Sequence, residues 1–145
     1  MEPDQQNMDF ISRNIDGDPN AKLVCAALHD HDGSLDMNIV DNPVEHSLLQ
    51  PDSGNPMGVR TVPVFTVDSL IDIVAIGKID FAKIEAEGVE LEIINGIRSS
   101  NIPKIVVDCS PARNGESPMQ EIRDILEMRG YKVVTRGWML FAKIL

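Results

Sequence analysis

The stretch Ile79–Gly96, IDFAKIEAEGVELEIING, decides the fold. Its first seven residues, 79–85, have the pattern of a short buried strand. Residues 88–95 follow with helical spacing, and Gly96 is typical of the position after a helix C-terminus. A strand that leads directly into a helix is the repeating unit of α/β proteins. This stretch therefore predicts one strand and one helix of a layered α/β domain.

The segments on either side of this stretch repeat the pattern. Apolar runs predict strands at 60–67, 104–110, 131–136 and 138–144, the last two as an antiparallel pair separated by Gly137. Pro63 indicates an edge position for the first of them. Further helices are predicted from Asp68 or Ser69 to Ile76, and from the capping box at 117–120 to Gly130.

The first 58 residues are less regular. Glu2-Pro3 opens a predicted helix that runs to about Ile15, since proline suits the first helical turn. Short strands are predicted at 22–28 and 34–40. Residues 41–58 are rich in Asn, Asp, Pro, Ser and Gly, which predicts one long loop. A loop of this length in a compact domain is usually functional.

The alternation of strands and helices over residues 60–136 predicts a doubly wound α/β domain. We expect residues 79–85, 104–109 and 131–136 to be adjacent strands of one sheet, with 138–144 antiparallel to its neighbour. Such a sheet normally begins with a strand and a glycine-rich turn. The chain has no G-x-G-x-x-G stretch and no strand before Pro3.

Composition and charge exclude several classes of protein. The 145 residues suit one domain, and their net charge of −10 opposes nucleic acid as the main partner. The negative charge is concentrated in residues 1–58, which have a net charge of −9. No apolar run approaches the ~20 residues of a membrane span, and the acidic N-terminus is unlike a secretory signal. We therefore expect a cytoplasmic protein, with Cys25 and Cys109 as small core residues.

The densest group of reactive side chains lies at 80–90. Glu85 ends the predicted strand, and Glu87 and Glu90 are neighbours at the start of the next helix. They could be ordinary first-turn carboxylates, which the helix dipole favours. Alternatively, they form a carboxylate pair with Lys83 at a strand tip, available for proton transfer or ligand binding.

Histidines and aromatic residues offer weaker candidates. His29-Asp30-His31-Asp32 has the composition of a metal-binding tract, but a turn leading into Gly33 explains the same residues and is the preferred interpretation. His46, in the predicted long loop, is a weak candidate for a general base. The aromatic residues of the last two strands are predicted to pack in the core: Tyr131, Trp138 and Phe141.

The block Asp80–Gly96 closely resembles the FkbM family of S-adenosylmethionine-dependent methyltransferases. That family carries a pattern similar to D-x-x-K-I-D-x-E-G-x-E-x-x-x-L-x-G, although this chain has Glu85 where the family usually has Asp. Shorter matches follow the family's order along nearly the whole chain: Glu2-Pro3 with Asn14, Ala27-Leu28 with Asp32-Gly33, residues 66–70, and Gly130-Tyr131.

The resemblance implies a Rossmann-like class I methyltransferase sheet with helices on both faces and a terminal antiparallel hairpin. The implied strand order is 3-2-1-4-5-7-6 within a single domain, 1–145. The first strand, the glycine loop and most of the second strand of that domain would be missing. We therefore expect an N-terminally truncated domain, with a misassigned start codon or a degenerate gene as explanations.

The resemblance also implies site residues. Glu2 would bind the ribose hydroxyls of S-adenosylmethionine, and the backbone at Ala27 and Leu28 would lie beside the adenine. The methyl-transfer cleft would be bordered by Lys83, Glu85, Glu87 and Glu90, with Glu85 also near the cofactor. We expect the chain alone to bind the cofactor weakly, because Glu2 is next to a free terminus.

The implied activity is methyl transfer to a hydroxyl oxygen of a sugar, glycolipid or natural product. The residues that would accept the hydroxyl proton are Glu85, Glu87 or His46, and the sequence does not rank them. No metal is required, although the clustered carboxylates leave one possible. Two alternatives remain: a non-catalytic remnant or partner-dependent subunit, and an α/β module that binds a sugar nucleotide.

Overall fold

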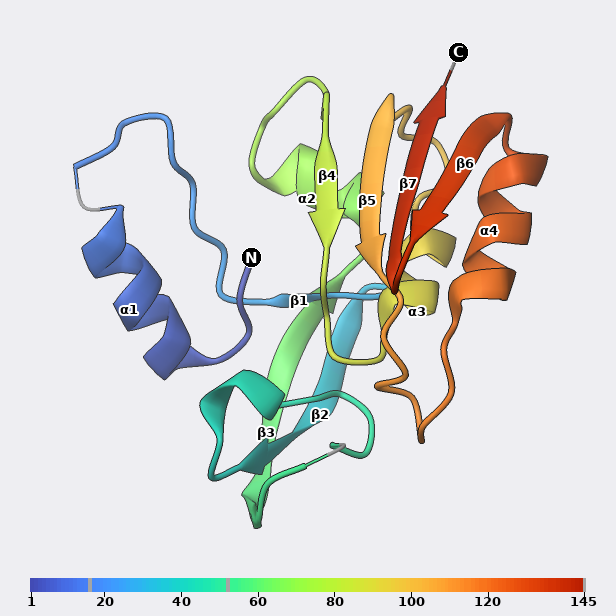
Figure 1. Ribbon diagram of the computed structural model, residues 1–145. Coiled ribbons are helices and arrows are strands. Elements are labelled where there is room, and N and C mark those ends of the chain that lie inside the picture. Colours follow the sequence, from blue (N-terminus) through green and yellow to red (C-terminus); the bar gives the residue numbers. More distant parts are fainter. Residues whose placement is uncertain (16, 52, 145) are drawn as a thin grey trace.

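The computed structural model describes residues 1–15, 17–51 and 53–144. It confirms a mixed α/β protein, whose elements run along the chain as shown in Figure 1. The helices are α1 (Gln5–Asn14), the 3-10 turn η1 (Pro43–Glu45), α2 (Val67–Ile73), α3 (Glu90–Asn95) and α4 (Met119–Met128). The strands are β1 (Ala27–Leu28), β2 (Gly33–Val40), β3 (Pro56–Phe65), β4 (Ala82–Ile84), β5 (Lys104–Asp108), β6 (Tyr131–Arg136) and β7 (Met139–Ile144).

The described strands form two mixed sheets, whereas one sheet was predicted. The first has the order β1-β3-β2, in which β1 is parallel and β2 antiparallel to β3. The second has the order β4-β5-β7-β6, in which only β4 and β5 are parallel. This is the order that the resemblance implies for the last four strands. In Figure 1 the first sheet lies below the second.

The predicted neighbours of the C-terminal strands need a correction. Residues 131–136 do not lie beside 104–109, because β7 is inserted between β5 and β6. The chain reverses at Gly137 and Trp138, and β7 then pairs antiparallel with both neighbours, as predicted for 138–144. The inward side chains of β7, Leu140 and Ala142, are buried. A central position in the sheet therefore removes the apolar side chains of this strand from water.

The hydrophobic core lies between the second sheet and helices α3 and α4. It joins side chains from the helices and from the inward face of the sheet: Ile93, Ile94, Ile105, Val107, Ile122, Leu126, Tyr131 and Leu140. The opposite face of this sheet is exposed, and helices on both faces are therefore not observed for it among the described residues. Consequently Tyr131 packs in the core as predicted, but Trp138 and Phe141 are exposed.

Several predicted boundaries differ in the first half. Strand β1 is only two residues long, and β4 only three, whereas β3 begins at Pro56 inside the predicted loop 41–58. That loop also contains η1, and its residue 52 lies outside the described residues. Strand β3 is central and not an edge strand, so the Pro63 prediction was wrong. Pro63 is tolerated because β1 begins opposite Val64, one residue further on.

The helix starts are set by different residues from those predicted. Asp4 is the N-cap of α1, so Pro3 lies before the helix and not in its first turn; the carboxylate of Asp4 accepts hydrogen bonds from the N–H groups of Gln6 and Asn7. Thr66 caps α2 by accepting from Ser69 N–H, in place of the predicted Asp68 or Ser69. A side-chain oxygen at the N-cap satisfies helix N–H groups that lack intrahelical partners.

Two further features of the chain can be checked directly. Cys109 is buried as predicted, but Cys25 is exposed, and both are free thiols. The described helices are all too short or too polar to cross a membrane. The core prediction failed at Cys25 because the predicted strand 22–28 forms only at Ala27 and Leu28, and Cys25 lies outside it.

Candidate functional site

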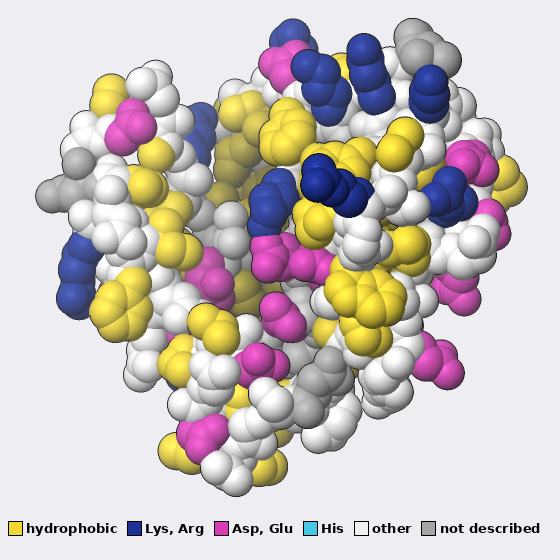
Figure 2. All heavy atoms as spheres, in the orientation of Figure 1, with side chains coloured by type: hydrophobic (Ala, Val, Ile, Leu, Met, Phe, Trp, Pro, Cys, Tyr) yellow, Lys and Arg dark blue, Asp and Glu magenta, His cyan; other side chains and the backbone are white. Residues whose placement is uncertain are grey.

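A cavity of about 750 Å³ lies between the two sheets. Residues 26–28, at the end of β1, form part of its wall, and residues 81–87, around β4, form another part. Helices α1, α2 and α3, strand β2 and the segment after β2 also contribute to the lining. In Figure 2 a hollow separates the part that carries α1 from the second sheet, and acidic side chains gather along its lower side. The volume falls within the ~300–1,000 Å³ of small-molecule sites.

The structure brings seven of the predicted site residues to this cavity, whereas Glu90, also expected to border the cleft, is buried and is not part of the lining. The lining includes the predicted cofactor contacts and the predicted catalytic groups: Glu2, Ala27, Leu28, His46, Lys83, Glu85 and Glu87. The predicted loop contributes Pro43, Val44, His46 and Leu48, so it borders the same cavity as Glu85 and Glu87. Residues more than 80 positions apart in the sequence therefore meet at one place.

The turn between β4 and α3 positions Glu87. The carboxylate of Glu90, which is 3% exposed, accepts hydrogen bonds from the N–H groups of Ala86 (2.7 Å) and Gly88 (3.1 Å). Glu87 has φ +50°, in the left-handed region that costs energy for residues with a Cβ. Gly88 has φ +108°, and a Cβ there would lie 2.7 Å from the carbonyl oxygen of Ala112. The hydrogen bonds to Glu90 and the close packing at Gly88 thus hold the turn in one conformation, so Glu90 has a structural role.

Ser47 connects the segment after β2 to the same turn by hydrogen bonds. Its hydroxyl donates a hydrogen bond to the carbonyl oxygen of Glu87 (2.6 Å) and accepts one from Leu49 N–H (3.0 Å). Ser47 is itself buried. The sequence analysis missed this residue, since a serine in a polar loop carries no local signal. The contact joins the two halves of the cavity wall.

The carboxylates around the turn disfavour one another's ionisation. Burial raises the pKa of Glu87, and the charges of Glu45, Glu90 and Glu85 raise it further. The pKa of Glu90 is also raised by burial, although its hydrogen bonds to backbone N–H groups oppose this. A carboxylate with a raised pKa is a better proton acceptor. Glu85 instead forms an ion pair with Lys83 at the exposed mouth of the cavity.

His46 is enclosed by protein groups. Its side chain is 9% exposed, its Nδ1 accepts a hydrogen bond from Val40 N–H (3.4 Å), and its Nε2 is 3.9 Å from the carboxylate of Asp4. Both ring nitrogens therefore face other protein atoms. This arrangement favours a structural role for His46 over that of a general base.

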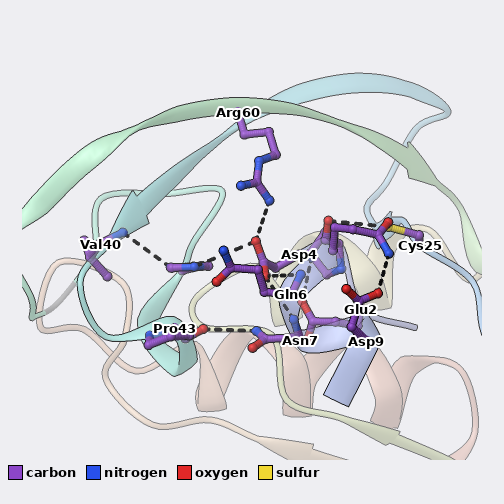
Figure 3. A network of polar contacts seen from close by, with 12 residues as sticks. Glu2, Asp4, Gln6, Asn7, Asp9, Cys25, Val40, Pro43 and Arg60 are labelled. Atoms are coloured by element: carbon purple, nitrogen blue, oxygen red, sulfur yellow. Dashed lines mark hydrogen bonds and ion pairs between the residues drawn. The ribbon is translucent and has the colours of Figure 1, made fainter. Parts of the chain in front are cut away.

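Asp4 is the centre of this network and was not singled out by the sequence analysis. It is 1% exposed, and its Oδ2 accepts a hydrogen bond from Arg60 Nη1 at 2.5 Å (Figure 3). Burial opposes ionisation of Asp4, but hydrogen bonds from Asn7 and Gln6 and the charge of Arg60 outweigh it and lower the pKa. No local pattern could have paired two residues 56 positions apart.

Glu2 is held at the cavity although it is next to the terminus. Its N–H donates to the carbonyl oxygen of Val24 (3.2 Å), and its Oε1 accepts from Asp4 N–H (2.8 Å). The N-terminal residues therefore run beside the segment that leads into β1.

The protein is thus an α/β protein with a cavity between two sheets, lined by carboxylates and apolar side chains. The sequence model of the Methyltransferase FkbM domain matches residues 1–133, which is nearly the whole chain, so the protein belongs to the FkbM methyltransferase family. No curated protein and no solved structure matches the chain. The family suggests methyl transfer as the activity.

Proposed function

We propose that this protein transfers a methyl group from S-adenosylmethionine to a hydroxyl oxygen of a sugar, glycolipid or other natural product. The observation that carries the proposal is the convergence of Glu2, Glu85 and Glu87 on one cavity in a member of a methyltransferase family. Two free thiols support a location in the cytoplasm, where disulfides are rare.

The chemistry of the lining fits the adenosine and sulfonium parts of the cofactor. Carboxylates accept hydrogen bonds from ribose hydroxyls and favour a positive charge nearby, and Glu2, which lines the cavity, would do so. Ala27 and Leu28 offer an apolar surface for a flat ring. The cofactor, when bound, supplies a methyl group on a positively charged sulfur.

Glu87 is the residue we propose as the proton acceptor. Its raised pKa and its place on the cavity wall suit removal of a proton from an acceptor hydroxyl. The Lys83–Glu85 pair at the mouth would orient the acceptor through its other hydroxyls. Most of the rate would come from holding the acceptor oxygen in line with the methyl group.

Calorimetric titration with S-adenosylmethionine tests the proposal. We expect weak binding, because the chain has no G-x-G-x-x-G turn to hold the methionine end. Glu2→Gln should weaken binding about tenfold, which corresponds to about 1.4 kcal/mol. The matched control is Glu121→Gln, an exposed carboxylate on α4, which should bind as the wild type does.

Two results would contradict the proposal. If Glu2→Gln binds as tightly as the wild type, the cofactor does not use this cavity wall. If a uridine diphosphate sugar binds and S-adenosylmethionine does not, the α/β sugar-nucleotide module is the better interpretation. Glu87→Gln should leave cofactor binding unchanged and reduce turnover about 100-fold once an acceptor is identified.

A further inference from the structure

The turn between β1 and β2 brings three potential metal ligands together. His29 Nδ1 is 2.7 Å and His31 Nδ1 2.6 Å from the same carboxylate oxygen of Asp30. The two Nδ1 atoms are 3.1 Å apart, and the rings meet edge to face. All three atoms therefore surround one point in space. Within the described residues, this is a group of histidine and carboxylate side chains whose ligand atoms converge.

The three atoms lie slightly closer together than ligands that share one ion. First-row transition ions bind imidazole nitrogen and carboxylate oxygen at about 2.0–2.2 Å. Two ligands are then about 3 Å apart at right angles and about 3.4 Å apart at a tetrahedral angle, so small rotations of these side chains would open the group to one ion. Without an ion, the Asp30 oxygen can accept a hydrogen bond from each ring. An ion at the centre would use the same three atoms and replace these hydrogen bonds with three bonds to the metal.

Contacts with the rest of the protein hold this turn in place. His29 N–H donates to Phe65 O (2.9 Å), and Arg98 Nη2 donates to Asp30 O (2.7 Å). The carboxylate of Asp32 accepts hydrogen bonds from Thr66 N–H and Ser69 Oγ, so Asp32 anchors the turn and is occupied elsewhere. A turn fixed by its backbone loses little entropy when its side chains bind an ion.

Gly96 explains how the turn packs so closely on the second half of the molecule. A Cβ at this position would collide with the carbonyl oxygen of His29. The glycine after α3 therefore allows the backbone at His29 to approach the end of that helix. The metal-ligand group sits on a rigid junction, which is where a precise binding geometry can be maintained.

We propose that His29, Asp30 and His31 bind one divalent first-row transition ion, such as Zn²⁺, through His29 Nδ1, His31 Nδ1 and the Asp30 carboxylate. Two imidazoles and one carboxylate suit ions of this class. The side chains of His29, Asp30 and His31 are 14%, 43% and 51% exposed, so the ion can enter from solvent and keep water at its remaining positions. This proposal replaces the expectation that the tract is a turn without a metal.

The proposed site is separate from the cavity and does not depend on the proposed function. Leu28 lines the cavity, but the three ligands that follow it are not part of the lining. An ion bound here would fix the position of the residues that follow β1. It would thereby stabilise the hydrogen bond from Arg98 Nη2 to Asp30 O. We therefore expect the ion to stabilise the fold, since a ligand that binds only the native state raises its stability.

Zinc titration of the full chain tests the site. After treatment with a chelator, the protein is titrated with Zn²⁺ by calorimetry, and with Co²⁺ while the visible absorption is recorded. We expect one ion per chain, a higher Tm with Zn²⁺, and at least ~10-fold weaker binding in His31→Gln and in Asp30→Asn. Both substitutions change half-exposed side chains, and circular dichroism verifies that the variants fold.

The controls address the other ligands in the chain. His46 is the one other histidine of the sequence, so His46→Gln should bind Zn²⁺ as the wild type does. Glu121→Gln should behave in the same way. Zinc binding that is unchanged in His31→Gln and Asp30→Asn would overturn the proposal. Failure of the wild type to bind Zn²⁺ at ~100 µM would overturn it as well, whatever the result with S-adenosylmethionine.

Discussion

At the scale of the residue, Asp68 couples α2 to the segment after α3. Its carboxylate accepts hydrogen bonds from the backbone N–H groups of Arg98 (3.2 Å), Ser99 (2.8 Å) and Ser100 (3.0 Å), and from both serine hydroxyls. Burial opposes ionisation, but the hydrogen bonds from Ser100 and Ser99 outweigh it and lower the pKa of Asp68 to about 2. Because the folded pKa is depressed, the stabilisation is fully present above pH ~3.8 and is lost as the pH falls through about 2. We expect Asp68→Asn to cost about 2 kcal/mol in urea unfolding at pH 7 and much less near pH 2. Asp80→Asn, at an exposed site, is the control, and an equal loss at both pH values would contradict the prediction.

At the scale of the element, the exposed face of the second sheet places like charges opposite one another. Lys143 on β7 is the direct partner of Lys104 on β5 and of Lys132 on β6. Like charges at paired positions destabilise a sheet by roughly 0.2–1 kcal/mol per pair. We expect Lys143→Glu to raise the free energy of unfolding by about 1 kcal/mol, because it turns two repulsions into attractions. Lys143→Gln should give a smaller gain. Both gains should shrink in ~1 M NaCl, and a gain that is independent of salt would show that charge is not the cause.

At the scale of the whole molecule, the two sheets are joined by side-chain contacts, and no strand pairing links them in the part of the chain that the structure describes. The bond from Ser47 Oγ to Glu87 O is one of these contacts. Ser47→Ala would leave a carbonyl oxygen without its partner in a buried place, at a cost of about 1–3 kcal/mol. We expect a lower denaturant midpoint and weaker binding of S-adenosylmethionine, because the turn with Glu87 loses its support. Ser34→Ala, at an exposed position on β2, is the control. Reduced binding with unchanged stability would contradict a structural role for Ser47.

Local sequence was sufficient for much of the second half. The strands β5, β6 and β7 and helix α4 lie within a few residues of their predicted positions, because apolar spacing, Gly130 and Gly137 act over short distances. The acidic cluster around Glu87 was also visible, since its members are neighbours in the chain. The resemblance, which rests on ordered motifs, predicted the family that the match over residues 1–133 confirms.

Only the tertiary structure decided which of these groups meet. The insertion of β7 between β5 and β6, the ion pair of Asp4 with Arg60 and the bond from Ser47 to Glu87 all join distant parts of the chain. The sequence could name His29 and His31 but could not orient their rings toward one oxygen. Local propensity acts within a few residues, whereas these contacts depend on which surfaces are buried together once the chain has closed its long loops.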